Sequence, residues 1–229
     1  MRELNFGDKP EGAAVLSHEM LDAIVAAGER QTFPRHTFLY RQGEDAALVH
    51  VLRSGRVKSC AIGTDGNETI YRLHLPGSVL GLTALGPRRK RDASAVAIED
   101  CETVAVHRDR LSEALQANGQ LALAVIELLL DRLWHFQFRM QEAFSMPAEV
   151  RLMRALLELS QEGQGSGTVA LSHEDLGHIV GARRPTVSKA LRVLAGMGLI
   201  ETAHLNIRIP DRAALRSAAE VSHDRAARL

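Results

Sequence analysis

The chain has 229 residues, of which 45% are hydrophobic and 24% charged, so it is long enough for two compact domains and is not a disordered chain. Lys plus Arg (28) balance Asp plus Glu (28), and only the distribution of charge can point to nucleic acid. The absence of a long apolar run excludes a membrane partner, and the first ten residues have no apolar core for a signal peptide. With only Cys60 and Cys101, which make no disulfide framework, we expect a protein of the reducing cytoplasm.

Short repeated units dominate the N-terminal half. Residues 14–30 have apolar side chains at helical spacing and predict a short amphipathic helix. From Phe33 to about Val106, short apolar runs alternate with glycines, and the sequence TDGN at 64–67 predicts a hairpin turn. The side chains that fit short strands are Val49, Val51, Val57, Ile70 and Leu73. Strand-and-turn units of this size predict a small sandwich or barrel.

A long helix follows a short helix at 109–115. Asn118 is a favoured N-cap residue, and helical spacing continues from there to about Phe144. One apolar stripe contains Ile126, Leu130, Leu133, Met140 and Phe144, and another contains Leu121, Val125, Leu128 and Leu129. An exposed helix needs only one apolar stripe, so two stripes predict two partners: the N-terminal domain and a twin helix. The alternative is one helix buried inside a monomer.

The C-terminal third predicts a helix-turn-helix. Pro147 ends the long helix and begins another at 148–161. Ser172 and Asp175 form a capping box that starts a helix at His173. Gly181 ends that helix, Gly177 leaves room for a second one, and Pro185 presets the first turn of the second helix.

The second helix of this motif is basic on its exposed face. Residues 183–192 include no acid, and the candidate DNA contacts are Arg183, Arg184, Pro185, Thr186, Ser188, Lys189 and Arg192. Cations and hydroxyls at a helix N-terminus bind phosphates, and long side chains reach base edges in a major groove of double-stranded DNA. A hairpin at 199–209 then predicts a wing, with His204, Asn206 and Arg208 available for phosphate, before a short helix from Asp211. The alternatives are a solvated basic face and, for His204, an ordinary loop residue.

Together these segments resemble the Crp/Fnr (catabolite activator) family of bacterial regulators. The resemblance covers nearly the whole chain, including QGE at 42–44, the glycine at 55, PG-x-x-x-G at 76–81, and LGHIVGARRPTVSKALRVLAGMGLI at 176–200. It implies an α+β protein with a cyclic-nucleotide-binding-like β-roll sensor domain (1–116), a dimerisation helix (117–145) and a winged helix-turn-helix domain (146–229). It also implies a homodimer on a two-fold symmetric operator, gated by the sensor domain, with RNA polymerase as a further partner.

The sensor region departs from relatives that bind cyclic AMP. Those relatives use a Gly-Glu pair for the ribose and an Arg-Ser or Arg-Thr pair for the phosphate. Here the matching positions are Gly81-Leu82 and Arg91-Asp92, and the long helix offers Phe136 and Gln137 where the family places small hydroxyls for the purine. We therefore expect an unknown small-molecule effector other than cyclic AMP in this pocket. The alternative is a constitutive regulator whose pocket is empty.

The DNA-reading positions also depart from the catabolite activator, which has Arg-Glu at the start of the recognition helix and an Arg four residues after the Glu. This chain has Arg184-Pro185 and Lys189, so we expect a different half-site in which Arg184 contacts guanine.

Other clusters give weaker signals. The basic run at 88–91 predicts a solvated loop, although an anionic effector or additional DNA contacts would also suit it. Haem bound through His74 or Cys60 lacks a recognisable ligand context, and no metal-binding spacing is present. We expect no cofactor. No catalytic constellation is recognisable, so we do not expect an enzyme.

Overall fold

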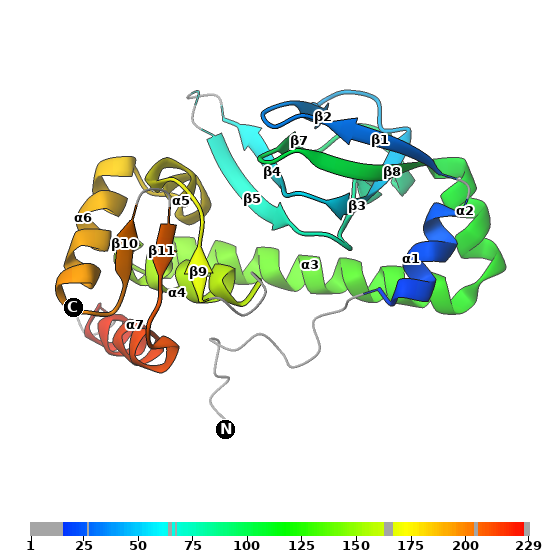
Figure 1. The fold of residues 1–229 in the computed structure, drawn as a ribbon. Helices are drawn as coiled ribbons and strands as arrows, with labels where there is room; N and C mark the ends of the chain where they lie inside the picture. The colour runs from blue at the N-terminus through cyan, green and yellow to red at the C-terminus, as the bar shows by residue number, and fades with distance from the viewer. Residues whose placement is uncertain are drawn as a thin grey trace, which may run out of the picture. The chain divides into compact units, whose positions relative to one another are not determined.

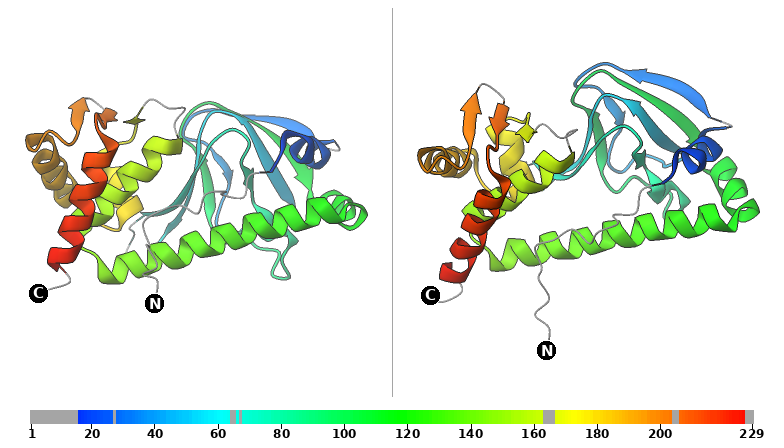
Figure 2. Two further views of the ribbon diagram at one scale, coloured as in Figure 1. Left: turned by 90° about the horizontal axis from the view of Figure 1, so that it is seen from below. Right: turned by 60° about the horizontal axis from the view of Figure 1, so that its bottom comes forward.

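The computed structural model describes residues 16–26, 28–63, 66, 68–162, 167–203 and 206–226, and it confirms the expected α+β fold (Figures 1 and 2). The chain forms two compact units, one from residues 1–61 and 71–138, the other from 62–70 and 139–229. A long helix, α3 (Gly119–Ser145), therefore contributes residues to both units.

Two four-stranded sheets, in which every recorded strand pair is antiparallel, form the β-roll. The first has the order β1-β8-β3-β6, and the second has the order β2-β7-β4-β5. The strands are β1 (Glu29–Phe33), β2 (Phe38–Tyr40), β3 (Leu48–Ser54), β4 (Val57–Ile62), β5 (Glu68–His74), β6 (Val79–Leu80), β7 (Ser94–Ala97) and β8 (Cys101–His107). The predicted strand residues Val49, Val51, Val57, Ile70 and Leu73 all lie in these strands.

Helices cover the first sheet through an apolar cluster. Val49, Val51 and Val106 of the sheet pack with Leu111 of α2 (Arg108–Ala117) and with side chains from α1 (His18–Val25). The prediction of a helix over 14–30 was wrong at its C-terminal end. There the backbone enters β1, because Glu29–Phe33 pairs with Cys101–Ala105 of β8 and takes its hydrogen bonds from the sheet.

The two apolar stripes of α3 have different environments. Asn118 caps the helix as predicted, since its Oδ1 accepts from the N–H groups of Gln120 and Leu121. Leu121 and Val125 are buried in the sheet-facing cluster, with Leu128 partly buried beside them. Leu129 differs from the prediction because 43% of it is exposed. The other stripe is exposed throughout: Ile126, Leu130, Leu133, Met140 and Phe144.

The second unit contains a three-stranded sheet and a helical core. The sheet order is β10-β11-β9, and its third strand was not predicted because two residues are too short for a period to be visible. The elements are α4 (Ala148–Glu162), β9 (Thr168–Val169), α5 (His173–Val180), α6 (Arg184–Gly196), β10 (Glu201–Ala203), β11 (Asn206–Arg208) and α7 (Arg212–Ala226). The last helix is longer than predicted, with 15 residues, and it buries Leu215 and Ala219.

Two buried histidines make the stability of the β-roll depend on pH. Burial lowers the pKa of His50 to about 4 and that of His74 to about 3, with the charges of Arg91 and of Arg132 adding to the respective shifts. Below about pH 6.5 the unfolded chain gains protons that the folded chain does not bind, so stability falls as the pH falls. We expect the midpoint of thermal unfolding to drop between pH 8 and pH 5. His74→Asn should reduce this drop in the unfolding midpoint, whereas His18→Gln, at an exposed site, should not. Equal drops in the two variants would contradict the role of the buried histidine.

Candidate nucleic-acid interface and sensor site

Local sequence signals build the helix-turn-helix as predicted. Ser172 caps α5, because its Oγ accepts from the Asp175 N–H at 3.0 Å and donates to the Asp175 carboxylate at 2.6 Å. Gly181 ends α5 in the left-handed region, with φ of 64°. Pro185 lies in the first turn of α6, which buries Val187, Leu191 and Leu194.

Gly177 allows the two helices to approach each other. A Cβ at this position would lie 2.6 Å from the carbonyl oxygen of Ala182, a backbone atom in the turn. We expect Gly177→Ala to cost about 1–3 kcal/mol of unfolding free energy and to weaken DNA binding, because the turn must shift. Gly196→Ala is the matched control, since a Cβ there meets nothing within 4 Å. Equal unfolding midpoints for the two variants would contradict the close approach.

The exposed face of α6 gathers cations without acids. Along residues 183–192, from the N-cap through the first nine residues of α6, the exposed members of the predicted contact set are Arg183, Arg184, Pro185, Thr186, Lys189 and Arg192. Within the described part of the chain, none of the four cations among them forms an ion pair. The side chains and the helix N-terminus are therefore available to an anionic partner.

Three other predicted contacts have different surroundings. Ser188 is half-buried, and its Oγ lies 3.0 Å from Nδ1 of His173, so it joins α6 to α5. Asn206 is exposed on β11, where the neighbouring Arg208 pairs with Glu201 at 2.9 Å. His204 lies outside the described residues.

The first unit, residues 1–61 and 71–138, contains most of the predicted sensor domain and is called the sensor unit below. In it, Arg91 is buried against backbone atoms and an aromatic ring. Only 5% of Arg91 is exposed, and its guanidinium donates to the carbonyls of Leu48 at 2.7 Å and Gly81 at 3.4 Å. Its Cζ lies 3.9 Å from the centre of the Tyr40 ring. A Cβ at Gly81 would collide with Nη1 of Arg91, so the glycine makes room for the guanidinium. Burial lowers the pKa of Arg91 and raises the pKa of Tyr40 to about 12.

The other predicted effector residues have different surroundings, and among them the charge of Asp92 interacts with Arg91 and opposes the lowering of its pKa. Leu82 is buried in the apolar cluster beneath the first sheet. Asp92 is exposed, and its carboxylate accepts from the Thr83 hydroxyl at 3.2 Å. Phe136 and Gln137 are exposed on α3.

Sequence reasoning missed Arg132 of α3, a second arginine, which is half-buried. Its Nη2 donates to the carbonyl of Val79, and burial lowers its pKa to about 10, with the charge of Arg72 adding to the shift. The Nε atoms of Arg91 and Arg132 are both buried without a hydrogen-bond partner among the described residues. The sequence contained one signal for Arg132: it lies one helical turn before Phe136, a predicted effector residue, so both are on the same face of the helix.

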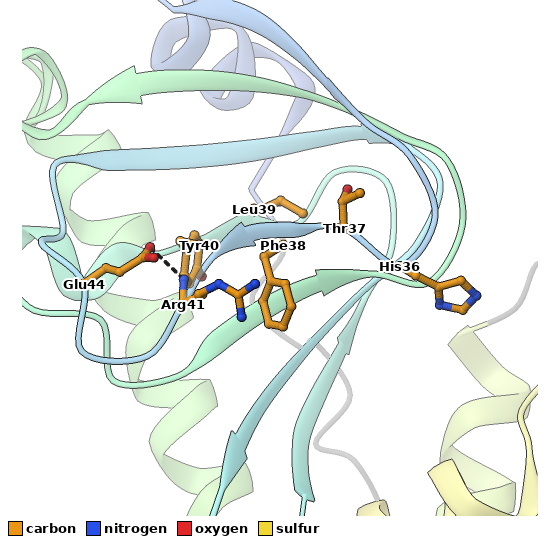
Figure 3. Close-up of a pocket in the computed structure, with 7 residues that line it drawn as sticks. All are labelled: His36, Thr37, Phe38, Leu39, Tyr40, Arg41 and Glu44. Atoms are coloured by element: carbon orange, nitrogen blue, oxygen red, sulfur yellow. Dashed lines mark hydrogen bonds between the residues drawn. The ribbon is translucent and has the colours of Figure 1, made fainter.

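An open cavity of about 520 Å³ lies along β2 (Figure 3). The Arg41 guanidinium stacks 3.6 Å from the Phe38 ring centre, and the Glu44 carboxylate accepts from the Arg41 N–H at 2.9 Å. The residues that line the cavity are His36, Thr37, Phe38, Leu39, Tyr40, Arg41 and Glu44. None of the predicted effector residues lines this cavity, but its lining residue Tyr40 contacts Arg91, so the cavity adjoins the predicted pocket.

The remaining candidates have local explanations. Cys60 and Cys101 are buried and not disulfide-bonded, and Nε2 of His74 lies 2.8 Å from the Ser59 hydroxyl. The four residues of the basic run at 88–91 have different environments. Arg91 is buried, whereas residues 88–90 are exposed, and Lys90 forms an ion pair with Asp45. Among the described helices, none has the length and apolar character required to cross a bilayer.

Two protein families match the chain. The cyclic nucleotide-binding domain matches residues 30–118, and the Crp-like helix-turn-helix domain matches residues 150–218. The chain is 27% identical over 204 residues to the Cyclic AMP receptor protein of Thermus thermophilus, covering 89% of this chain and 94% of that one. It is 28% identical over 212 residues to the nitrogen fixation regulation protein FixK of Azorhizobium caulinodans, covering 89% and 84%.

A similar solved structure is that of FixK2 from Bradyrhizobium japonicum. It has a TM-score of 0.76 and 27% identity, covering 83% of this chain and 96% of that one. These matches include both the sensor unit and the helix-turn-helix, in the order found here. The chain therefore belongs to the Crp/Fnr family of transcriptional regulators, with a DNA-binding helix-turn-helix and a cyclic-nucleotide-binding-like domain.

Proposed function

We propose that this regulator acts in the cytoplasm as a homodimer on a two-fold symmetric operator, with α6 of each subunit in the major groove. In this proposal residues 1–116 sense a signal, 117–145 dimerise, 146–229 bind DNA, and RNA polymerase is a further partner. The observation that supports it best is the set of exposed cations Arg183, Arg184, Lys189 and Arg192 along residues 183–192, none of which forms an ion pair within the described residues. Phosphate contacts position such a helix, and long side chains then read the bases.

The operator should differ from that of the catabolite activator. Arg184 is exposed in the first turn of α6 and can donate two hydrogen bonds to guanine, whereas the adjacent Pro185 has no side-chain acceptor for cytosine. Half-site centres about 34 Å apart suit two α6 helices on one face of DNA. Selection of duplexes from a random library with the purified protein tests this. We expect a symmetric sequence, and recovery of the catabolite-activator consensus would contradict the proposed readout.

The exposed stripe of α3 supports a second copy of the chain as the partner. Leu123, Ile126, Leu130, Leu133, Met140 and Phe144 are each 48–88% exposed. Together with Gln137 they repeat at alternating spacings of three and four residues, which is the seam of a two-stranded coiled coil. A polar residue at one seam position is the usual means of fixing the register of such a pair.

We further propose that a signal other than cyclic AMP gates the sensor domain. Arg91 already donates to two carbonyl groups. Leu82 is an apolar residue at the position where relatives that bind cyclic AMP have a Glu for the ribose. Asp92 would repel a phosphate held by Arg91 by about 3 kcal/mol at ~5 Å and an effective dielectric of ~20, or roughly a hundredfold in affinity.

Calorimetric titration tests this prediction. We expect no micromolar binding of cyclic AMP and no effect of cyclic AMP on operator affinity. Micromolar binding that also tightens operator binding would contradict it. The Thermus relative bears the name of a cyclic AMP receptor, so that protein is the positive control for the titration.

The second candidate is a constitutive regulator whose activity depends on its abundance. The observation in its favour is again Arg91, whose guanidinium fills the space above Gly81 and contacts Tyr40. A gel-shift assay with and without metabolite extract separates the two candidates. A change in operator affinity supports gating, and an unchanged affinity supports the constitutive regulator.

A further inference from the structure

A buried carboxylate lies near the end of α3. The Glu142 side chain is only 3% exposed, and one of its oxygens lies 3.2 Å from Nη1 of Arg154 on α4. Its other oxygen lies 3.9 Å from Nη1 of Arg139, which is also 3.8 Å from the Glu158 carboxylate. Burial raises the pKa of Glu142, and the two arginines oppose that shift. These four side chains join the last turns of α3 to α4.

Arg139 extends this network to the C-terminal end of α5, and Arg151 donates to the same helix end. Arg139 Nη2 donates to the carbonyl of Ile179 at 2.6 Å. Arg151 of α4 donates from Nε to Val180 at 2.8 Å, from Nη2 to Gly181 at 3.3 Å and from Nη1 to Met146 at 2.6 Å. The last carbonyls of a helix lack intrahelical donors, and cations there interact favourably with the helix dipole. Arg139 and Arg151 thus supply donors from α3 and α4 to one helix end.

That helix end lies immediately before the recognition helix. The chain passes from Gly181 through Ala182 and Arg183 to the start of α6 at Arg184. The turn is tight, because the N–H groups of Gly181 and Ala182 both donate to Gly177. A shift at the end of α5 therefore moves the first residues of α6, which include the predicted base contact.

We propose that Arg139 and Arg151, with Glu142 holding Arg139, are positioning residues that set DNA affinity by fixing the α5–α6 turn against the end of the dimerisation helix. This inference rests on the proposed function. Neither arginine belongs to the exposed cation face of α6, and each acts through backbone carbonyls and not through DNA.

The test compares Arg139→Gln, Arg151→Gln and Glu142→Gln with the wild-type dimer on its selected operator. We expect the dissociation constant to rise about tenfold or more in each variant at a temperature where the variant is folded and dimeric. Because no phosphate contact is lost, the slope of affinity against salt should remain that of the wild type. Arg139→Lys, which retains a donor for Ile179, should recover part of the affinity. Arg110→Gln, on α2 of the sensor unit, is the matched control and should change nothing.

Each outcome decides between roles. Wild-type affinity in a folded, dimeric Arg139→Gln or Arg151→Gln protein would overturn the proposal. A salt slope reduced by about one for each contact would also overturn it, in favour of direct phosphate binding. A lower unfolding temperature with unchanged affinity would show a purely structural role and overturn it as well.

A measurement without DNA separates this inference from the proposed function. Amide hydrogen exchange of residues 177–187 in the free dimer should be faster in the two arginine variants than in the wild type and in Arg110→Gln. If the wild type selects no operator, the proposed function fails while exchange still tests the turn. If exchange is unchanged in both variants, the positioning role fails and the proposed function stands.

Discussion

Replacing Arg184 and Lys189 together by Ala is expected to abolish specific operator binding while leaving the dimer intact. Both side chains are exposed on α6 and neither forms an ion pair within the described residues. In a homodimer the double change removes four contacts. At about 1 kcal/mol or more for each contact, affinity should fall at least about a thousandfold. Fluorescence anisotropy with the selected operator measures the loss, and sedimentation checks the dimer.

The control must remove the same charge elsewhere. Arg30→Ala with Arg110→Ala also removes two cations per subunit, from exposed pairs with Glu102 and Glu113 in the sensor unit. We expect this variant to bind the operator within a few-fold of the wild type. If the Arg184 and Lys189 variant retained wild-type affinity, α6 would not be the recognition helix. If both variants lost affinity equally, the effect would come from net charge.

Local signals predicted the DNA-binding unit well because each lies in a few adjacent residues. The cap at Ser172, the glycine at 181 and the proline at 185 set the backbone wherever the chain folds, and the structure places all three as expected. The extent of the first helix was wrong, because pairing between Glu29–Phe33 and β8 joins residues about seventy positions apart. Such long-range pairing overrides helical periodicity and leaves no local mark.

The sensor site was less predictable for a related reason. Comparison with the family's nucleotide-binding positions identified Arg91 and Gly81. In the structure the Arg91 guanidinium donates to the Gly81 carbonyl. Leu82 instead entered the apolar core, because a leucine gains more free energy there than beside a polar pocket. Arg132 was missed because an arginine within an apolar helix normally extends its charged end to water. Here the neighbouring strand supplies the carbonyl of Val79, which no sequence window around residue 132 contains.

Leu130→Glu should convert the protein to a monomer. Leu130 is 58% exposed and lies midway along the exposed stripe, between Ile126 and Leu133. In a parallel pair of α3 helices the change places two carboxylates opposite each other in an apolar seam. Each would lose hydration at a cost of several kcal/mol, so the dimer dissociation constant should rise at least about a thousandfold. Sedimentation at micromolar concentration measures this directly.

Operator affinity should fall with the dimer, because a monomer occupies only one half-site and loses the effective concentration of its twin. Val221→Glu is the matched control, since Val221 is 65% exposed on α7, outside the stripe. A folded Leu130→Glu protein that remains dimeric would exclude this face as the interface. A monomer that still bound the full operator with wild-type affinity would instead show that dimerisation is unnecessary. Leu130→Glu therefore tests the proposed seam on α3 by the mass of the protein in solution, whereas the Arg184 and Lys189 substitutions test the cations of α6 by operator affinity in an intact dimer.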